Sequence, residues 1–185
     1  MIDLRMRDLP NSVITDEGKS VLLNTDFRIW IRFSEDLKND DDDRNISYVF
    51  AEEPPFINDF ILAQLIAFLQ NPSETPMQEA SGERVLDYVK DGEYIFSALY
   101  ATYGIDIIEM DMHWHKFQAL CNNVIGEKTL WGYAKSMRGY QKPSSSDSYE
   151  KQCLRAKEMW SLPEIMTKEE IEKESEFEEY FSGAN

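Results

Sequence analysis

The residue types best suited to bind a metal ion are the two histidines, His113 and His115. On a β-strand, a His-x-His spacing would direct both rings to the same side and could begin a zinc site. The neighbouring apolar positions instead recur as on a helix, where the two side chains diverge by about 200°. One ring is then expected to face the core and the other to face solvent. We predict that neither histidine binds a metal and that thermal unfolding responds to replacement of only the core-facing one.

The possible nucleophiles are also best explained by structural roles. Cys121 shares one predicted helix face with Trp114 and Phe117, which indicates packing rather than catalysis. The first residues form no apolar run of the kind that a secretory signal needs. Cys121 and Cys153 are therefore expected to be free, buried thiols in a reducing compartment. The run Ser144–Ser146 follows a proline and is predicted to be a linker.

The spacing of the glycines and acids does not support a phosphate or calcium site. The eight glycines form no phosphate loop, dinucleotide fingerprint or nucleophile elbow. The run Asp40–Asp43 lacks the glycine and the final glutamate of a calcium loop, so it is predicted to be a solvated acidic loop. The sequence therefore predicts no catalytic, cofactor-binding or metal-binding residues, no cofactor, and no enzyme activity.

Net charge limits the partners that the chain can bind. Its 35 acidic and 19 basic residues give a net charge of −16, which repels nucleic acid and anionic membranes. The longest apolar run, Phe56–Leu69, is interrupted by polar residues and is too short to span a membrane. We expect no nucleic acid partner, no membrane partner and a location in the cytoplasm.

One segment departs from this acidic balance. Residues 112–142 carry five basic residues against one acidic residue, with five aromatic residues interleaved. Such a pattern can bind single-stranded nucleic acid, but several of the aromatic residues have the spacing of core positions. The segment is better interpreted as an interface for an acidic partner segment, one candidate being the chain's own C-terminal tail. The basic residues are Lys116, Lys128, Lys135, Arg138 and Lys142, and the aromatic residues are Trp114, Phe117, Trp131, Tyr133 and Tyr140.

The elements that would position these residues are mainly helical. Two strand-like runs flank Asp16–Lys19 and predict a β-hairpin over about residues 11–24. Thr25 or Asp26 can cap the helix that follows. The face of this helix that meets the core is predicted to include Phe27, Trp30 and Ile31, with Ser34 as an optional fourth position.

A second helix, opened by Pro54-Pro55, has apolar residues around most of its circumference and is predicted to be a central core helix. It is expected to stop at Asn71–Pro76. A break is expected at Gly92, where Asp91 can cap the next helix. Helices are also predicted over residues 85–103, 112–124, 129–137, 147–161 and 167–181.

The predicted fold class is mainly α, with a single helical domain, a small N-terminal β-hairpin and an acidic C-terminal helical arm. The core domain spans residues 1–163, and residues 164–185 form an acidic amphipathic tail with eight glutamates and two lysines. The tail is interpreted either as a solvated helix or as a helix that docks on the basic segment 112–142 or on another subunit. Its apolar residues are Ile171, Phe177, Tyr180 and Phe181.

Several blocks of the sequence resemble one protein family. The main blocks are Asn24–Phe33 (NTDFRIWIRF), Asp91–Asp106 (DGEYIFSALYATYGID) and Met112–Leu120 (MHWHKFQAL). With Leu9-Pro10 and the segment Lys157–Pro163, they make the chain similar to the bacteriophage gene-product-fifteen family of long-tailed phages and prophages of Gram-positive bacteria.

The resemblance implies a function in phage tail morphogenesis. Family members are encoded near the tail-tube and tape measure genes, the usual position of tail assembly chaperones, and no catalytic residues are assigned in the family. The family pattern has tryptophan where this chain has His115, which argues further against a metal ligand there.

The implied function is that of a non-enzymatic tail assembly chaperone. It would act with the tape measure or tail tube protein in the host cytoplasm, with a homo-oligomer as one option. The alternative is a structural component of the mature phage particle, at a tail end or neck. A third hypothesis is a small enzyme or metal-binding protein.

Overall fold

A computed structural model of the chain describes residues 5, 7–38, 45–70, 84–124, 128–141 and 148–163. Within these residues, the mainly α class with an N-terminal hairpin is confirmed. The elements are β1 (Ser12–Ile14), β2 (Ser20–Leu22), α1 (Phe27–Asp36), the short 3-10 helix η1 (Ser47–Val49), α2 (Asp59–Gln70), α3 (Gly92–Tyr103), α4 (Trp114–Asn123), α5 (Leu130–Arg138) and α6 (Ser148–Trp160).

Several predicted features lie outside the described residues, so the division into a core domain and a tail stays a prediction. These features are the acidic run Asp40–Asp43, the stop at Asn71–Pro76, the linker Ser144–Ser146 and the tail 164–185.

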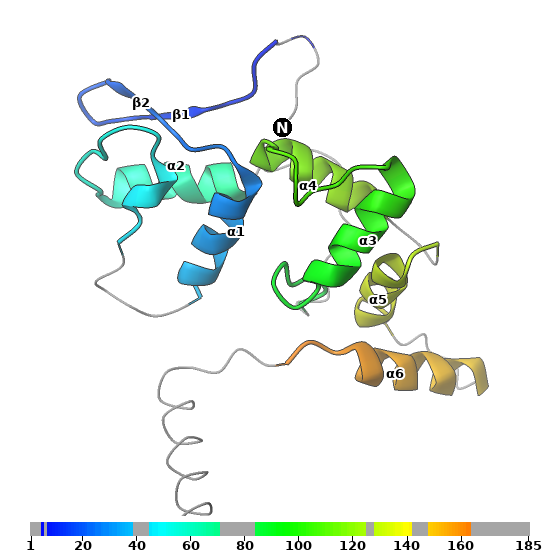
Figure 1. Cartoon of the computed structure of the whole chain (residues 1–185). Helices are drawn as coiled ribbons and strands as arrows, with labels where there is room; N and C mark the ends of the chain where they lie inside the picture. The colour runs from blue at the N-terminus through cyan, green and yellow to red at the C-terminus, as the bar shows by residue number, and fades with distance from the viewer. Residues whose placement is uncertain are drawn as a thin grey trace, which may run out of the picture.

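The hairpin and α2 occupy one end of the molecule, and α5 and α6 occupy the other (Figure 1). Helices α1, α4 and α3 lie between them. One cluster of buried side chains runs from the hairpin to α5. The largest fully buried side chains in this cluster are Trp30, Trp114, Trp131, Phe33 and Phe117.

The hairpin forms where the sequence predicts it. Strands β1 and β2 pair antiparallel, with Val13 opposite Val21 and both side chains buried. The turn contains Gly18, whose φ of +79° lies in the left-handed region that glycine adopts without strain.

Both outer edges of the hairpin are hydrogen-bonded to other parts of the chain. The Gln64 side chain of α2 meets the edge of β1. Its Oε1 accepts from the Ile14 N–H at 2.9 Å, and its Nε2 donates to the Ile14 carbonyl at 2.8 Å. On the β2 side, the Ala51 N–H donates to the Leu22 carbonyl at 3.0 Å. Neither edge is therefore left fully open for another strand.

The start of α1 is joined to the start of α4. Asp26 caps α1, because its Oδ1 accepts the Arg28 N–H at 2.9 Å. The Phe27 N–H donates to the Met112 carbonyl at 3.0 Å. The rings of Phe27 and Phe117 stack with centroids 4.3 Å apart, so α1 and α4 pack tightly at this point.

Helix α2 differs from the prediction in its start and in its burial. It begins at Asp59 rather than at Pro54, because the Asn58 side chain accepts the Ile61 N–H at 3.0 Å, as an N-cap does. Only one face is covered by the rest of the fold, and Phe60 remains 50% exposed. The prediction of a helix buried all round is therefore wrong. The buried residues of α2 are Ile61, Leu65 and Phe68.

Helix α3 begins at Gly92, at the predicted break. The helix predicted before it, from residue 85, is wrong: residues 84–91 are not helical, and the Asp87 Oδ1 accepts the Val89 and Lys90 N–H groups in a turn. Asp91 occupies the N-cap position, but its side chain makes no capping hydrogen bond. The helix ends at Gly104, whose φ is +67°, as the glycine position predicts.

The buried side chain of Arg138 holds α3, α5 and the end of α6 together. Its Nη1 and Nη2 donate to the two carboxylate oxygens of Asp91 at 2.6 and 2.9 Å. Its Nη1 also donates to the Val85 carbonyl at 3.2 Å, and its Nε donates to the Trp160 carbonyl at 2.6 Å. A buried guanidinium requires such partners, because an unpaired buried charge is strongly destabilising.

Candidate functional site

His113 acts as the N-cap of α4. Its Nδ1 accepts a hydrogen bond from the His115 N–H at 3.1 Å, and its Nε2 lies 2.9 Å from the Pro10 carbonyl oxygen. Because Nδ1 accepts, Nε2 must carry the proton and donate to that carbonyl. Burial lowers the pKa of His113, which favours this neutral form.

His115 is buried and also neutral. It is 3% exposed, and its Nε2 lies 3.0 Å from the Phe68 carbonyl oxygen at the end of α2. The other ring nitrogen, Nδ1, has no hydrogen-bond partner among the described residues. Burial lowers the pKa of His115 to about 4, because a second proton would place a charged ring in the core.

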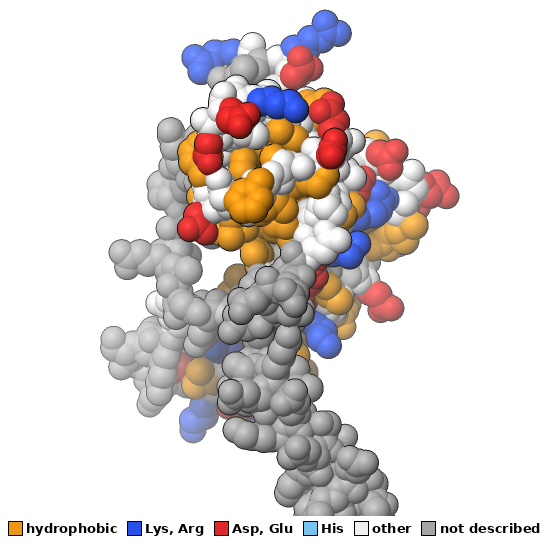
Figure 2. Space-filling view, turned by 90° about the vertical axis from the view of Figure 1, so that its left-hand side faces the viewer, with side chains coloured by type: hydrophobic (Ala, Val, Ile, Leu, Met, Phe, Trp, Pro, Cys, Tyr) orange, Lys and Arg blue, Asp and Glu red, His pale blue; other side chains and the backbone are white. Residues whose placement is uncertain are grey.

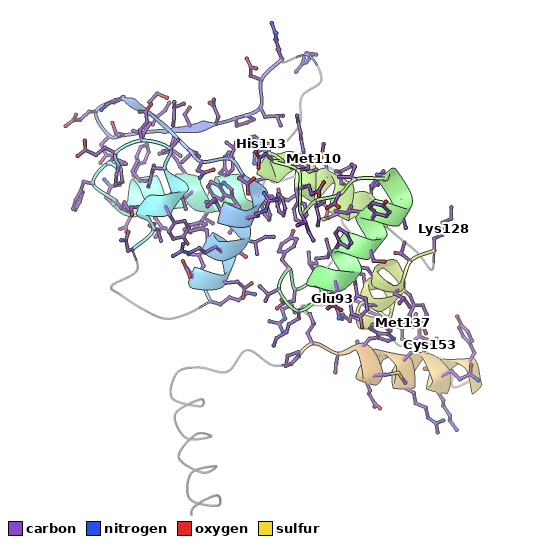
Figure 3. The ribbon with its side chains drawn as sticks, in the orientation of Figure 1. Glu93, Met110, His113, Lys128, Met137 and Cys153 are labelled. Carbon is purple, nitrogen blue, oxygen red and sulfur yellow. The ribbon has the colours of Figure 1, made fainter. Side chains whose placement is uncertain are left out.

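The predicted divergence of the two histidines is wrong. Their ring centroids lie 5.0 Å apart, edge to face. The reason is that His113 precedes the helix, with φ −61° and ψ 136°, so helical spacing does not separate the two rings. Figure 3 shows His113 at the start of α4, beside Met110.

This pair does not gather further ligand types around it. Within the described residues, no group of three or more His, Cys, Asp or Glu side chains is placed to hold a metal ion. Both ring Nε2 atoms are already directed at backbone carbonyls. His113 therefore links the start of α4 to Pro10, and His115 links α4 to the end of α2.

The two cysteines are free and buried, as expected. Burial raises the pKa of the Cys121 thiol to about 12, whereas a nucleophilic cysteine needs a lowered pKa. In Figure 3, Cys153 on α6 lies toward Met137 on α5, at the packed junction of these helices. Both cysteines are therefore best explained as buried side chains that pack in the fold.

The basic segment 112–142 does not form the continuous basic surface that its composition suggests. Arg138 is buried against Asp91, and the Lys135 Nζ donates to the Cys121 carbonyl at 3.0 Å. The described lysines that face solvent are Lys116 and Lys128, and Lys128 projects from the molecule in Figure 3. Three of the interleaved aromatic side chains, Trp114, Phe117 and Trp131, are fully buried and cannot stack on bases.

The surface beside the start of α2, by contrast, exposes large aromatic side chains. A groove of about 400 Å³ lies between the hairpin turn and the segment that leads into α2. Phe56 lines this groove and is 88% exposed. Phe60, in the first turn of α2, is 50% exposed. Two large aromatic side chains in water at one end of a small domain are the type of patch that marks an interaction site.

Acidic side chains lie beside these two phenylalanines. Asp16, Glu17 and Glu53 line the groove with Phe56, and Lys19 is the single lysine among its described lining residues. Asp59 adds a fourth exposed acid at the first residue of α2. Figure 2 shows this face, with hydrophobic side chains in the middle and Asp and Glu side chains around them. We call this set the α2 surface: Phe56 and Phe60 with the rim Asp16, Glu17, Glu53 and Asp59.

The α2 surface continues onto a face of the helix that carries no charge. Ala63 and Ala67 follow Phe60 at helical spacing and are exposed. From residue 60 to residue 70 the sequence contains no Asp, Glu, Lys or Arg. A helix face that only meets water usually carries charged residues, so this one has the composition of a contact face.

A second groove of about 380 Å³ lies between α4 and the loop before it. Its lining is largely apolar and includes Ile105, Met110 and Leu120, with Lys116 among its residues. Its charged lining residues, Asp111 and Lys116, have opposite signs, so the groove does not indicate the charge of a partner.

Sequence reasoning missed the α2 surface because the apolar pattern of residues 56–69 was assigned entirely to the core. One signal was present: Phe56 follows Glu52-Glu53 after two prolines and Phe60 directly follows Asp59, as expected at the boundary of a charged rim.

A comparison with protein families gives a match that spans the described fold. The family model described as Bacteriophage Gp15 protein matches residues 6–162, a range that includes the hairpin, all six described α-helices and the α2 surface. No curated protein and no solved structure matches the chain. Among the described residues, no helix combines the length and hydropathy needed to cross a bilayer.

Proposed function

Because the chain belongs to the bacteriophage Gp15 protein family, we propose that it is a non-enzymatic tail assembly chaperone that binds the tape measure protein. The family membership itself supports the broader statement that the chain is a structural or morphogenesis protein of a phage. The observation that carries the narrower proposal is the α2 surface, an exposed aromatic patch on a strongly acidic protein.

The physical task of such a chaperone matches this surface. A tape measure protein is long and helical, and it exposes apolar stripes before the tail tube closes around it. Phe56 and Phe60 can cover part of such a stripe, because both are accessible without rearrangement of the core. The net charge of −16 would keep the complex soluble and repel other copies of it.

We propose that the protein acts in the host cytoplasm, before the particle is complete, and without catalysis. The roles of its most reactive side chains support this view. Both histidine rings are used in hydrogen bonds to the backbone, and the Cys121 thiol is held in its protonated form by burial.

The proposal is tested by co-expression with the tape measure protein of the same phage genome. The soluble fraction of the tape measure protein, measured after centrifugation, should rise when the chaperone is present. An unrelated acidic protein of similar net charge serves as the control and should not raise it.

Purified phage particles give the second measurement. A chaperone should be absent from them. If the tape measure protein stays insoluble and the protein is found in particles in a fixed ratio, it is a structural component of the particle, at a tail end or neck, and the proposal is wrong.

A further inference from the structure

We infer that the α2 surface binds a basic amphipathic α-helix from a partner chain. The inference rests on the proposed function in one respect: the partner expected to carry this helix is the tape measure protein. The apolar centre of the surface, its charged rim and the hydrogen bonding of the hairpin beside it define the chemistry of the partner.

The apolar centre supplies the anchor. Phe56 is 88% exposed and Phe60 is 50% exposed, so both rings gain by being covered. The groove of about 400 Å³ beside Phe56 can accept side chains from a partner. An aromatic residue next to a groove is a common centre of a protein interface.

The rim determines the charge of the partner. Asp16, Glu17 and Glu53 line the groove with Phe56, and Asp59 directly precedes Phe60 in α2. Among the described residues that line the groove, Lys19 is the one basic residue. A partner segment that covers the phenylalanines must bring its own side chains close to these carboxylates. Lysine or arginine at the edge of the apolar stripe would be attracted, and acidic residues would be repelled.

This charge also argues against the other possible occupants. The chain's own tail, residues 164–185, carries eight glutamates and two lysines. A second copy of the chain would bring a net charge of −16 and the same acidic rim. Neither complements the α2 surface as a basic segment does.

The hairpin favours a helix over an added strand. A partner strand needs an edge with unpaired N–H and C=O groups. The edge of β1 is bonded to Gln64 at Ile14, and the edge of β2 is bonded to Ala51 at Leu22. The uncharged face of α2, by contrast, is a surface along which a second helix can pack.

The inference is tested with a model peptide. The probe is a helical peptide of about 18 residues, five turns long, with leucine on one face and lysine on the other. Its affinity for the full chain is measured by fluorescence anisotropy. A peptide with glutamate in place of every lysine is the control and should bind at least about tenfold more weakly, because its charges face the acidic rim.

Two matched variants test the apolar centre. Phe56→Asp removes the anchor and should weaken binding of the lysine peptide by about tenfold or more. Leu130→Asp, at another exposed apolar residue, adds the same charge and should change binding by less than about twofold. Met110→Asp tests the second groove and should also have little effect. Equal loss in Phe56→Asp and Leu130→Asp, or a loss confined to Met110→Asp, overturns the inference.

A second pair of variants tests the rim and does not depend on Phe56. Glu53→Lys should weaken binding of the lysine peptide by about threefold and reduce its dependence on salt. Glu158→Lys, on α6, makes the same charge change away from the α2 surface and should have a smaller effect. If the two variants behave alike, only the net charge of the chain matters and the inference is wrong.

Overlapping peptides from the tape measure protein separate this inference from the proposed function. If the lysine peptide binds at Phe56 but no tape measure peptide binds, the proposed function fails and the partner chemistry stands. If tape measure peptides bind equally well to Phe56→Asp and to the unchanged chain, the proposed function stands and the inference fails.

Discussion

Acid should destabilise the fold through the two histidines at the start of α4. The folded chain holds His115 with a pKa of about 4, whereas an unfolded histidine has a pKa of about 6.5. The unfolded state therefore takes up the proton first as pH falls. The stability that the neutral ring contributes is complete above pH of about 7.5 and is lost as the pH falls from about 6.5 to about 4.

The magnitude follows from the difference between the two pKa values. At pH 5.0, the unfolded histidine is almost fully protonated and the folded one is mostly neutral, so linkage predicts a loss of about 2 kcal/mol from His115. Complete protonation, below pH of about 4, raises the loss to about 3 kcal/mol. His113 adds a loss of the same sign, because its pKa is also lowered by burial.

Urea unfolding followed by circular dichroism at pH 7.5 and 5.0 measures this loss. The control is the same experiment on His115→Gln, because glutamine can still donate to the Phe68 carbonyl but does not titrate. The carboxylates that titrate near pH 5 are common to both proteins and cancel in the comparison. An equal loss of stability in the two proteins would refute this explanation.

Three further predictions concern stability. Arg138→Leu should lower the free energy of unfolding by about 3–5 kcal/mol in urea, because it leaves the Asp91 carboxylate buried without its partner; a change under about 1 kcal/mol would contradict this. Gly104→Ala should cost about 1 kcal/mol because its φ is +67°, whereas Gly92→Ala, with open space and no positive φ, should not destabilise. Truncation before Thr167 should leave the thermal midpoint unchanged, and a large decrease would show that the tail belongs to the core.

The helices could be predicted from the sequence because their signals are local. The apolar residues of α1 recur at helical spacing, and Asp26, one of the two predicted caps, is the N-cap. The helix predicted over residues 129–137 forms as α5, with Thr129 as its N-cap: the Thr129 Oγ1 accepts the Gly132 N–H at 3.0 Å. Such features depend on residues a few positions apart, so they can be identified without the fold.

The burial of α2 could not be predicted in the same way. Phe60 and Ile61 are adjacent apolar residues in one helix, yet one is half exposed and the other is 1% exposed. Whether an apolar side chain finds a partner depends on elements far away in the sequence, and composition does not contain that information. The α2 surface therefore became visible only with the fold.

The same reason explains the basic segment 112–142. The sequence shows five cations close together, but the partner of Arg138 is Asp91, 47 positions away. Lys135 lies over the Trp131 ring, with its Nζ 3.9 Å from the ring centroid. Arg138 and Lys135, which the sequence suggested as surface charges, therefore make contacts within the fold.

The most direct test of the α2 surface is hydrogen exchange on the full chain, with and without the tape measure protein. Binding at the α2 surface should slow amide exchange over residues 53–67 in the complex and leave exchange in α5 unchanged. Unchanged exchange over residues 53–67 in a complex that forms, with protection elsewhere or nowhere, would contradict the assignment of the α2 surface as the binding site.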